Sequence, residues 1–155
     1  AGTYVTHGEC YMDSPDDYSK NFLAIGGEFQ GEAWKRIGFV HDILEALPNP
    51  LNHCDPSWDL HTASAGKHYY LVYLGKDVRE EWTFELPEKN AGYPSLKKGV
   101  KFKVEIIDTW NMTVEECQKT FETTKAYNKR VYDKNHGKVK LPALPYLLLR
   151  ITPAD

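Results

Sequence analysis

The spacing of apolar residues changes once along this 155-residue chain, and the change separates a helical part from a β part. Between about Glu32 and Leu47, apolar side chains recur every three or four residues, which is the period of one buried helix stripe. The stripe consists of Ala33, Ile37, Val40, Leu44 and Leu47. Beyond residue 57 the period falls to two, the repeat of a strand with one buried face. The chain is therefore predicted to be mainly β, with one amphipathic helix near its start.

Four segments of the second part carry strand patterns, namely 68–74, 81–86, 100–106 and 146–151. The second and third alternate strictly, and the third places Val100, Phe102, Val104 and Ile106 on one face. The last segment is apolar at almost every position, so it is expected at the centre of a sheet. Short strands at this spacing indicate a C-terminal antiparallel β-sandwich.

The segments around the helix predict how the two parts are joined. A short strand at 3–7, a polar loop and a glycine-rich bend precede the helix, so this region forms one βα unit. Pro48 and Pro50 end the helix, because proline cannot continue its hydrogen-bond ladder. Residues 48–57 hold three prolines and are expected to be an extended linker. The predicted domains are therefore 1–51 and 52–155.

Residues 111–137 carry a weaker pattern. Thr113 and Glu116 have the spacing of a capping box, and Val114, Cys117 and Phe121 continue at helical spacing. One or two helical turns are predicted there, followed by an irregular arm.

Charge and composition exclude several classes of partner. Nineteen Lys and Arg residues against 22 Asp and Glu residues give a net charge of −3. Without a polybasic surface, neither nucleic acid nor an anionic membrane is expected as the main partner. No apolar run approaches the roughly 18 residues that span a bilayer, and the start, Ala1–Tyr4, lacks the pattern of a signal peptide.

The cysteines do not predict a disulfide framework or a metal site. Cys10, Cys54 and Cys117 are an odd number of widely spaced thiols, so at least one is free. His53, Asp55 and His61 surround Cys54, but their spacing matches no standard metal site and favours a polar linker. No metal or other cofactor is expected.

Two groups of segments carry a family resemblance. Residues 2–9, 26–28 and 31–37 resemble the end of the catalytic barrel of bacterial glycoside hydrolases of the apiosidase-like endoglucanase group. Residues 69–75 and 104–113, the latter ending in Asp-Thr-Trp-Asn-Met-Thr, are similar to the immunoglobulin-like β-sandwich that follows the barrel in those enzymes. The resemblance implies that 1–51 is the last βα unit of a (β/α)₈ barrel and that 52–155 is an accessory sandwich.

The resemblance also implies which residues face the sugar. The strand at 2–7 would be the eighth of the barrel, and active sites lie at the C-terminal ends of barrel strands. His7, Glu9 and Tyr11 are therefore expected to bind substrate, an oligo- or polysaccharide held by the parent barrel. In related barrels the paired catalytic carboxylates come from earlier strands of the barrel. No catalytic residue is therefore assigned, and the chain alone is expected to have no catalytic activity. The resemblance implies a bacterial source, and a cytoplasmic localisation is favoured over secretion.

Two other functions remain open from the sequence. A stand-alone carbohydrate-binding module would present a row of exposed aromatic rings. Tyr69 and Tyr73 share one strand face and Tyr70 the other, so at most half of these rings are free, while Trp82 and Trp110 are expected in the core. A structural interaction domain would instead leave the helix stripe at Ile37, Val40 and Leu44 exposed, and the chain would self-associate through that stripe.

Overall fold

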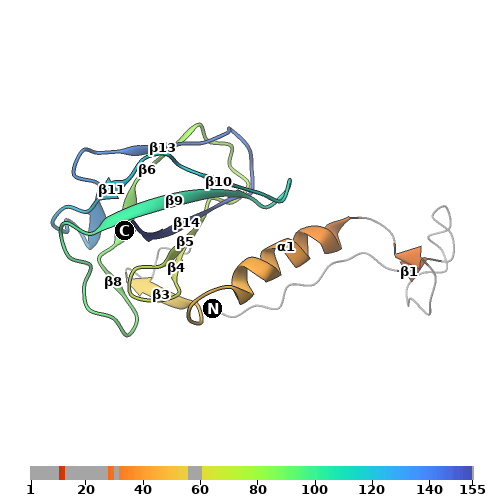
Figure 1. Cartoon of the computed structure of the whole chain (residues 1–155), viewed down its shortest axis with the longest axis horizontal. Helices are drawn as coiled ribbons and strands as arrows, with labels where there is room; N and C mark the ends of the chain where they lie inside the picture. The colour runs from red at the N-terminus through yellow and green to blue at the C-terminus, as the bar shows by residue number, and fades with distance from the viewer. Residues whose placement is uncertain (1–10, 13–27, 30–31, 56–60, 155) are drawn as a thin grey trace. The chain divides into compact units, whose positions relative to one another are not determined.

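The computed structural model of the chain describes residues 11–12, 28–29, 32–55 and 61–154 (Figure 1). The described residues up to Ala46 belong to one compact unit, and those from Leu47 onward belong to another. No helix among these described residues is both long enough and apolar enough to cross a membrane.

The first unit contains the predicted helix. Helix α1 spans Ala33–Glu45, and the N–H of Ala46 donates to the carbonyl of Asp42 at its end. Its most buried side chain is Ile43, whereas the predicted stripe residues Ile37, Val40 and Leu44 are half-buried. Strands β1 (Tyr11–Met12) and β2 (Glu28–Phe29) pair antiparallel. The predicted strand at 3–7 lies outside the described residues.

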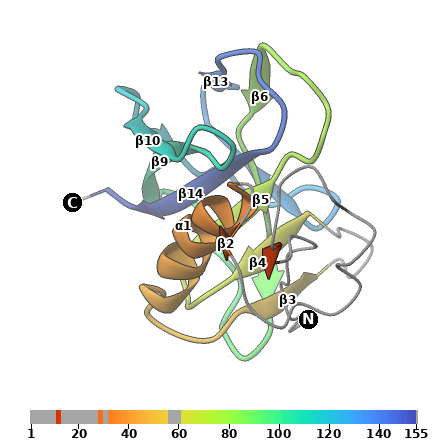
Figure 2. The same ribbon diagram turned by 90° about the vertical axis from the view of Figure 1, so that its right-hand side faces the viewer.

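The second unit is built on one large antiparallel sheet. Its order is β10-β9-β14-β5-β4-β3-β8, with β11 paired to β9 beyond the end of β10, as Figures 1 and 2 show for the labelled strands. The bounds are β3 (Asn52–Asp55), β4 (Thr62–Ser64), β5 (Tyr70–Tyr73), β8 (Lys89–Asn90), β9 (Lys101–Asp108), β10 (Thr113–Glu116), β11 (Phe121–Glu122) and β14 (Leu147–Pro153). The central position predicted for the last apolar strand is confirmed, because β14 lies between β9 and β5.

Two smaller strand pairs supply the other side of the core. Strand β6 (Glu81–Thr83) pairs with β13 (Lys138–Lys140), and β7 (Glu85–Pro87) pairs with β12 (Arg130–Tyr132). Alternate side chains of β5, β9 and β14 pack with those of the small pairs, and the most buried are Tyr70, Phe84, Leu86, Phe102, Val104, Phe121, Val131, Val139, Leu149 and Ile151. The unit is therefore mainly β with antiparallel sheets, consistent with a β-sandwich.

A single continuous strand was predicted at 81–86, and the structure divides it. Phe84 lies between β6 and β7, and its N–H donates to the carbonyl of Gly137, one register step beyond the Thr83–Lys138 pair of β6 and β13. Its ring stacks on Phe121, with the ring centroids 4.7 Å apart and the planes at 4°. The break lets one short segment pair with two different partners.

The prediction of a linker at 48–57 is wrong for residues 52–55. These residues are extended, as the prolines suggested, but they form β3, which pairs with β4 on one side and β8 on the other. Cys54 is buried there and packs against the core. Only pairing with segments distant in sequence makes this stretch part of a sheet.

The predicted helical turns after residue 111 are also wrong. Residues 113–116 form β10, which folds back on β9 as a hairpin. The buried Asp108 carboxylate accepts hydrogen bonds from the N–H groups of Trp110 and Asn111, each at 2.9 Å. This turn and the β-branched pair Thr113 and Val114 favour a strand over a helix.

The two tryptophans expected in the core have different environments. Trp82 is buried, as predicted, whereas Trp110 is 53% exposed at the tip of the β9–β10 hairpin. The predicted face of the third strand segment is confirmed, because Phe102 and Val104 are fully buried, with Val100 and Ile106 packed against the core.

Candidate functional site: a polar pocket beside Trp82

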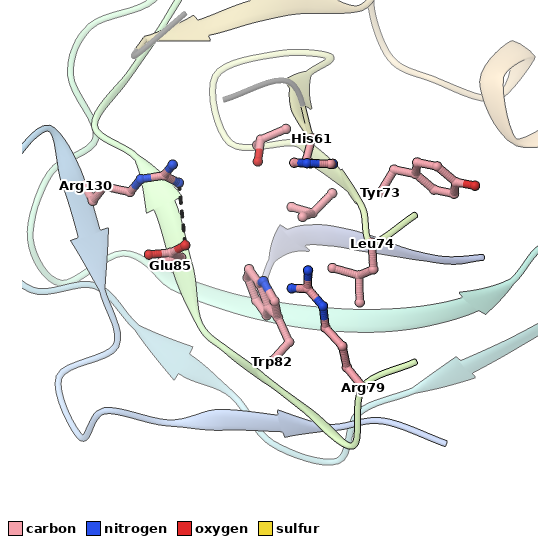
Figure 3. A pocket seen from close by; sticks show the side chains of 9 residues that line it. His61, Tyr73, Leu74, Arg79, Trp82, Glu85 and Arg130 are labelled. Atoms are coloured by element: carbon pink, nitrogen blue, oxygen red, sulfur yellow. Dashed lines mark ion pairs between the residues drawn. The ribbon is translucent and has the colours of Figure 1, made fainter. Parts of the chain in front are cut away.

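A pocket of about 260 Å³ opens where the large sheet meets the small strand pairs (Figure 3). Its lining comes from the start of β4, the end of β5, the β5–β6 loop, β6, β7 and β12. The lining residues are His61, Thr62, Val72, Tyr73, Leu74, Arg79, Trp82, Glu85 and Arg130. The volume suits one sugar-sized ligand better than an extended polymer.

Strand register brings these residues together. Thr62 lies opposite Val72 in the β4–β5 pair, and the N–H of Tyr73 donates to the carbonyl of His61 at 2.9 Å. On the other side, β12 runs against β7, which places Arg130 near Glu85. Arg130 Nη1 lies 3.7 Å from Glu85 Oε1, the ion pair dashed in Figure 3.

The described wall of the pocket carries two guanidinium groups and one carboxylate. Arg79 also lies 3.5 Å from Asp77 on the neighbouring loop, with both side chains largely exposed. Burial raises the pKa of Tyr73, and the neighbouring Tyr146 phenol raises it further, so Tyr73 stays neutral and can both donate and accept hydrogen bonds. Aromatic surface beside charged hydrogen-bonding groups is the chemistry of a polar small-molecule site.

The comparisons with known proteins give this unit a family. Residues 58–152 match the model of a family described as "Domain of unknown function (DUF5605)", and the match spans more than half of the chain. The chain belongs to this family. No curated protein matches the chain.

A solved structure gives the DUF5605 chain a longer relative. The chain is similar to the crystal structure of "a putative glycoside hydrolase from Bacteroides vulgatus ATCC 8482", with 52% sequence identity and a TM-score of 0.89. The match covers 99% of this chain but 29% of that chain. This chain therefore spans less than a third of the length of the relative.

The described lining of the pocket in the DUF5605 chain does not contain the pair of groups that cuts a glycosidic bond. That reaction normally needs two carboxylates flanking the bond, one as acid and one as nucleophile or base. Among the described lining residues Glu85 is the one carboxylate, and it is paired with Arg130. The described lining can bind a polar ligand but shows no second carboxylate beside Glu85.

A second hollow contains two carboxylates, Glu122 and Asp133, but both are engaged. Asp133 is buried and accepts hydrogen bonds from the N–H groups of Glu122, Asn135 and Gly137, at 2.8 to 3.0 Å. Burial alone would raise the pKa of Asp133, but these backbone donors and Lys119 hold it below its ordinary value. Glu122 is in turn 2.5 Å from Lys134 Nζ. Asp133 therefore stays ionised and stabilises a turn. A catalytic acid must instead carry a proton that it can donate.

Among the substrate-binding residues expected from the sequence, Tyr11 is the one that the structure describes. His7 and Glu9 lie outside the described residues, and Tyr11 is in β1, opposite Phe29. Their role in binding substrate stays a prediction. The pocket residues Arg79, Glu85 and Arg130 had no motif to mark them. The pairing of β7 with β12 brings Arg130 near Glu85, and Arg79 comes from the β5–β6 loop.

The residues considered for a metal site lie in one strand and at one position outside it. His53 and Cys54 lie in β3, and His61 precedes β4. Within 32–55 and 61–154 no group of three or more His, Cys, Asp or Glu side chains is placed to hold a metal ion.

Proposed function

We propose that this chain is the accessory part of a glycoside hydrolase and does not cut glycosidic bonds by itself. In this proposal residues 52–155 are an immunoglobulin-like sandwich that packs on the catalytic barrel and stabilises it. Residues 1–51 are the last βα unit of that barrel, and His7, Glu9 and Tyr11 face its substrate. The parent enzyme is a bacterial member of the apiosidase-like group. It acts on an oligo- or polysaccharide and needs no metal cofactor.

The observation that carries this proposal is the match to the Bacteroides vulgatus protein. Identity of 52% over nearly the whole chain supports a shared role, and more than two thirds of that protein lies beyond the matched segment. A catalytic barrel needs about 250 residues, which is more than this chain provides. The engaged state of Glu85, Glu122 and Asp133 gives independent support.

Hydrolysis assays test the proposal directly. The chain and the Bacteroides vulgatus protein are incubated in parallel with a panel of aryl glycosides and plant and host polysaccharides. Release of reducing ends by the longer protein alone is the expected result. Turnover by this chain, abolished by Glu85→Gln or Glu122→Gln, would overturn the proposal.

A second candidate function is sugar binding at the pocket beside Trp82. It is favoured by Trp82, Tyr73 and Arg79, which all line this pocket and come from three neighbouring segments. Titration calorimetry with neutral and carboxylated oligosaccharides tests it. Binding that is lost in Arg79→Gln but kept in Lys140→Gln, a change on strand β13 away from this pocket, would support a carbohydrate-binding module.

A third reading concerns α1, whose residues Ile37, Val40 and Leu44 are half-buried. If this stripe drives self-association, sedimentation velocity shows a larger species that dissociates in Val40→Glu. A monomer at all concentrations argues against it.

A further inference from the structure

Exposed apolar side chains gather at one end of the large sheet. Nine large apolar side chains in the described part of the chain are exposed, and six of these come from three neighbouring segments. The six, called the aromatic end below, are Tyr73, Trp110, Met112, Val114, Leu144 and Tyr146. Contiguous apolar surface of this kind marks an interaction site more often than scattered single residues do.

Strand register shows that two of the six continue an apolar row across the sheet. Tyr73 lies opposite Leu148, Leu148 lies opposite Ile107, and Ile107 lies opposite Val114. Directly opposed residues share a face, and this face is the one turned away from the core that contains Val72, Ile106 and Leu149. The two inner members are buried and the two outer ones are about 40% exposed.

The Tyr146 ring is presented by strained but firmly held backbone. Tyr146 has a φ of 61°, in the left-handed region that costs an ordinary residue free energy. Its N–H donates to the carbonyl of Gly75 and its carbonyl accepts from Thr109 Oγ1, both at 2.7 Å. Met112 and Ala143, on the two loops that carry the aromatic end, also have positive φ values. The fold therefore fixes Tyr146 in a conformation that local sterics disfavour.

The chemistry of this surface suits a protein partner better than a sugar. The Trp110 and Tyr146 rings stack on each other, with centroids 5.8 Å apart, so each gives one face to the other. The polar side chains between them are already used, since Thr109 donates to Tyr146 and the Asn111 side chain donates to Asp108 at 2.7 Å. The Tyr73 and Tyr146 hydroxyls can still bond a partner, but Met112, Val114 and Leu144 expose apolar surface, which suits a protein interface better than a sugar.

We propose that the aromatic end is the surface through which this chain docks on the rest of the glycoside hydrolase polypeptide. The inference rests on the proposed function, and it adds the face that makes the contact. The occupant is the part of the parent that lies beyond the matched segment, which makes up 71% of the Bacteroides vulgatus protein since the match covers 29%. Apolar burial at the core of an interface, with Trp and Tyr as anchors, is the usual composition of such contacts.

Hydroxyl-radical footprinting tests the proposal, because Trp, Tyr and Met side chains are oxidised readily when exposed. The chain is labelled alone and again as a chimera, in which it replaces its matching segment in the Bacteroides vulgatus protein. Oxidation of Trp110, Met112 and Tyr146 is expected to fall several-fold in the chimera. Tyr127, 69% exposed and outside the aromatic end, is the internal control and should be oxidised equally in both.

Three results would overturn the docking surface. The first is equal oxidation of Trp110 and Tyr146 in the chain and in the chimera. The second is protection of the chain alone by added oligosaccharide, which would assign the surface to a sugar. The third is protection that grows with the concentration of the chain alone, which would assign it to a second copy.

Hydrogen exchange gives a readout that does not depend on the chimera. In the unaltered Bacteroides vulgatus protein, the segment that matches 107–114 should exchange more slowly than residues 107–114 of this chain alone. Hydrolysis by the unaltered protein, measured in the same preparation, separates the two proposals. Hydrolytic activity without slower exchange of the matching segment would overturn the docking surface. Slower exchange without hydrolysis of any glycoside would overturn the proposed function.

Discussion

The sheet unit contains two stacked aromatic pairs in opposite environments. Phe84 and Phe121 are fully buried, and their rings are parallel in the core. Trp110 and Tyr146 are tilted by 29° and exposed, and Tyr146 stands on left-handed backbone. The core pair stabilises the fold through burial. The exposed pair gains less from burial within this chain than the core pair does, since Trp110 is 53% and Tyr146 37% exposed.

Removing the buried ring is the largest expected perturbation. Phe84→Ala deletes a fully buried side chain that contacts Phe121, Trp82 and Phe102. The free energy of unfolding should fall by about 3–5 kcal/mol, since a cavity remains between the layers. Urea unfolding followed by circular dichroism measures it. A loss below about 1 kcal/mol would show that the core pair matters no more than the exposed one.

Adding a methyl group beside the buried pair comes next. A Cβ on Gly137 would lie 2.8 Å from Asp133 Oδ2 and 3.0 Å from Phe121 Cε1. Because Asp133 is held by three backbone donors, Gly137→Ala should destabilise the chain by about 1–3 kcal/mol. Gly38→Ala is the matched control, as nothing lies within 4 Å of its Cβ and alanine favours helix α1. A neutral Gly137→Ala would mean that this turn is not tightly packed.

The carboxylate under the buried pair predicts a pH dependence. The folded-state pKa of Asp133 is lowered, so its stabilising contribution is present above its unfolded pKa, about 4, and is lost as pH falls through the folded value. Asp133→Asn should cost about 1–2 kcal/mol near neutral pH and flatten the acid limb of the stability profile. Unfolding midpoints between neutral and acid pH test this. Glu116→Gln, at an exposed site, should leave the profile as in wild type.

The smallest effect is expected at the exposed pair. Trp110→Ser should lower the unfolding free energy of the isolated chain by about 0.5–1.5 kcal/mol, because Trp110 is half exposed and loses mainly its stacking on Tyr146. The same urea titration measures it. A loss as large as that of Phe84→Ala would mean that the exposed stack holds the hairpin together, and the contrast between the pairs would disappear.

Local patterns in the sequence predicted the elements whose structure depends on their own residues. The spacing at 32–47 gave α1 almost to the residue, and the apolar run at 146–151 gave the central strand β14. The alternation at 100–106 gave the core face of β9. In each case burial of one face decides the structure, and the spacing of apolar residues in the sequence identifies that face.

Pairings between distant segments could not be predicted in this way. Residues 52–55 became β3 only by pairing with β4 and β8, and Thr113–Glu116 became β10 because the Asp108 turn returns the chain onto β9. The pocket beside Trp82 depends on the register of β12 against β7. Trp110 was misplaced for the same reason, as its position at a hairpin tip follows from the turn and not from its hydrophobicity.

The central place of β14 has a consequence for how the chain acquires its structure. Translation delivers β5 and β9 to the nascent chain before residues 147–153 exist. Until then, the strand that lies between them is missing, and each presents an open row of N–H and C=O groups to its surroundings. The large sheet therefore closes late and in one step, and the ribosome-bound precursor is the species most exposed to mispairing with a neighbouring chain.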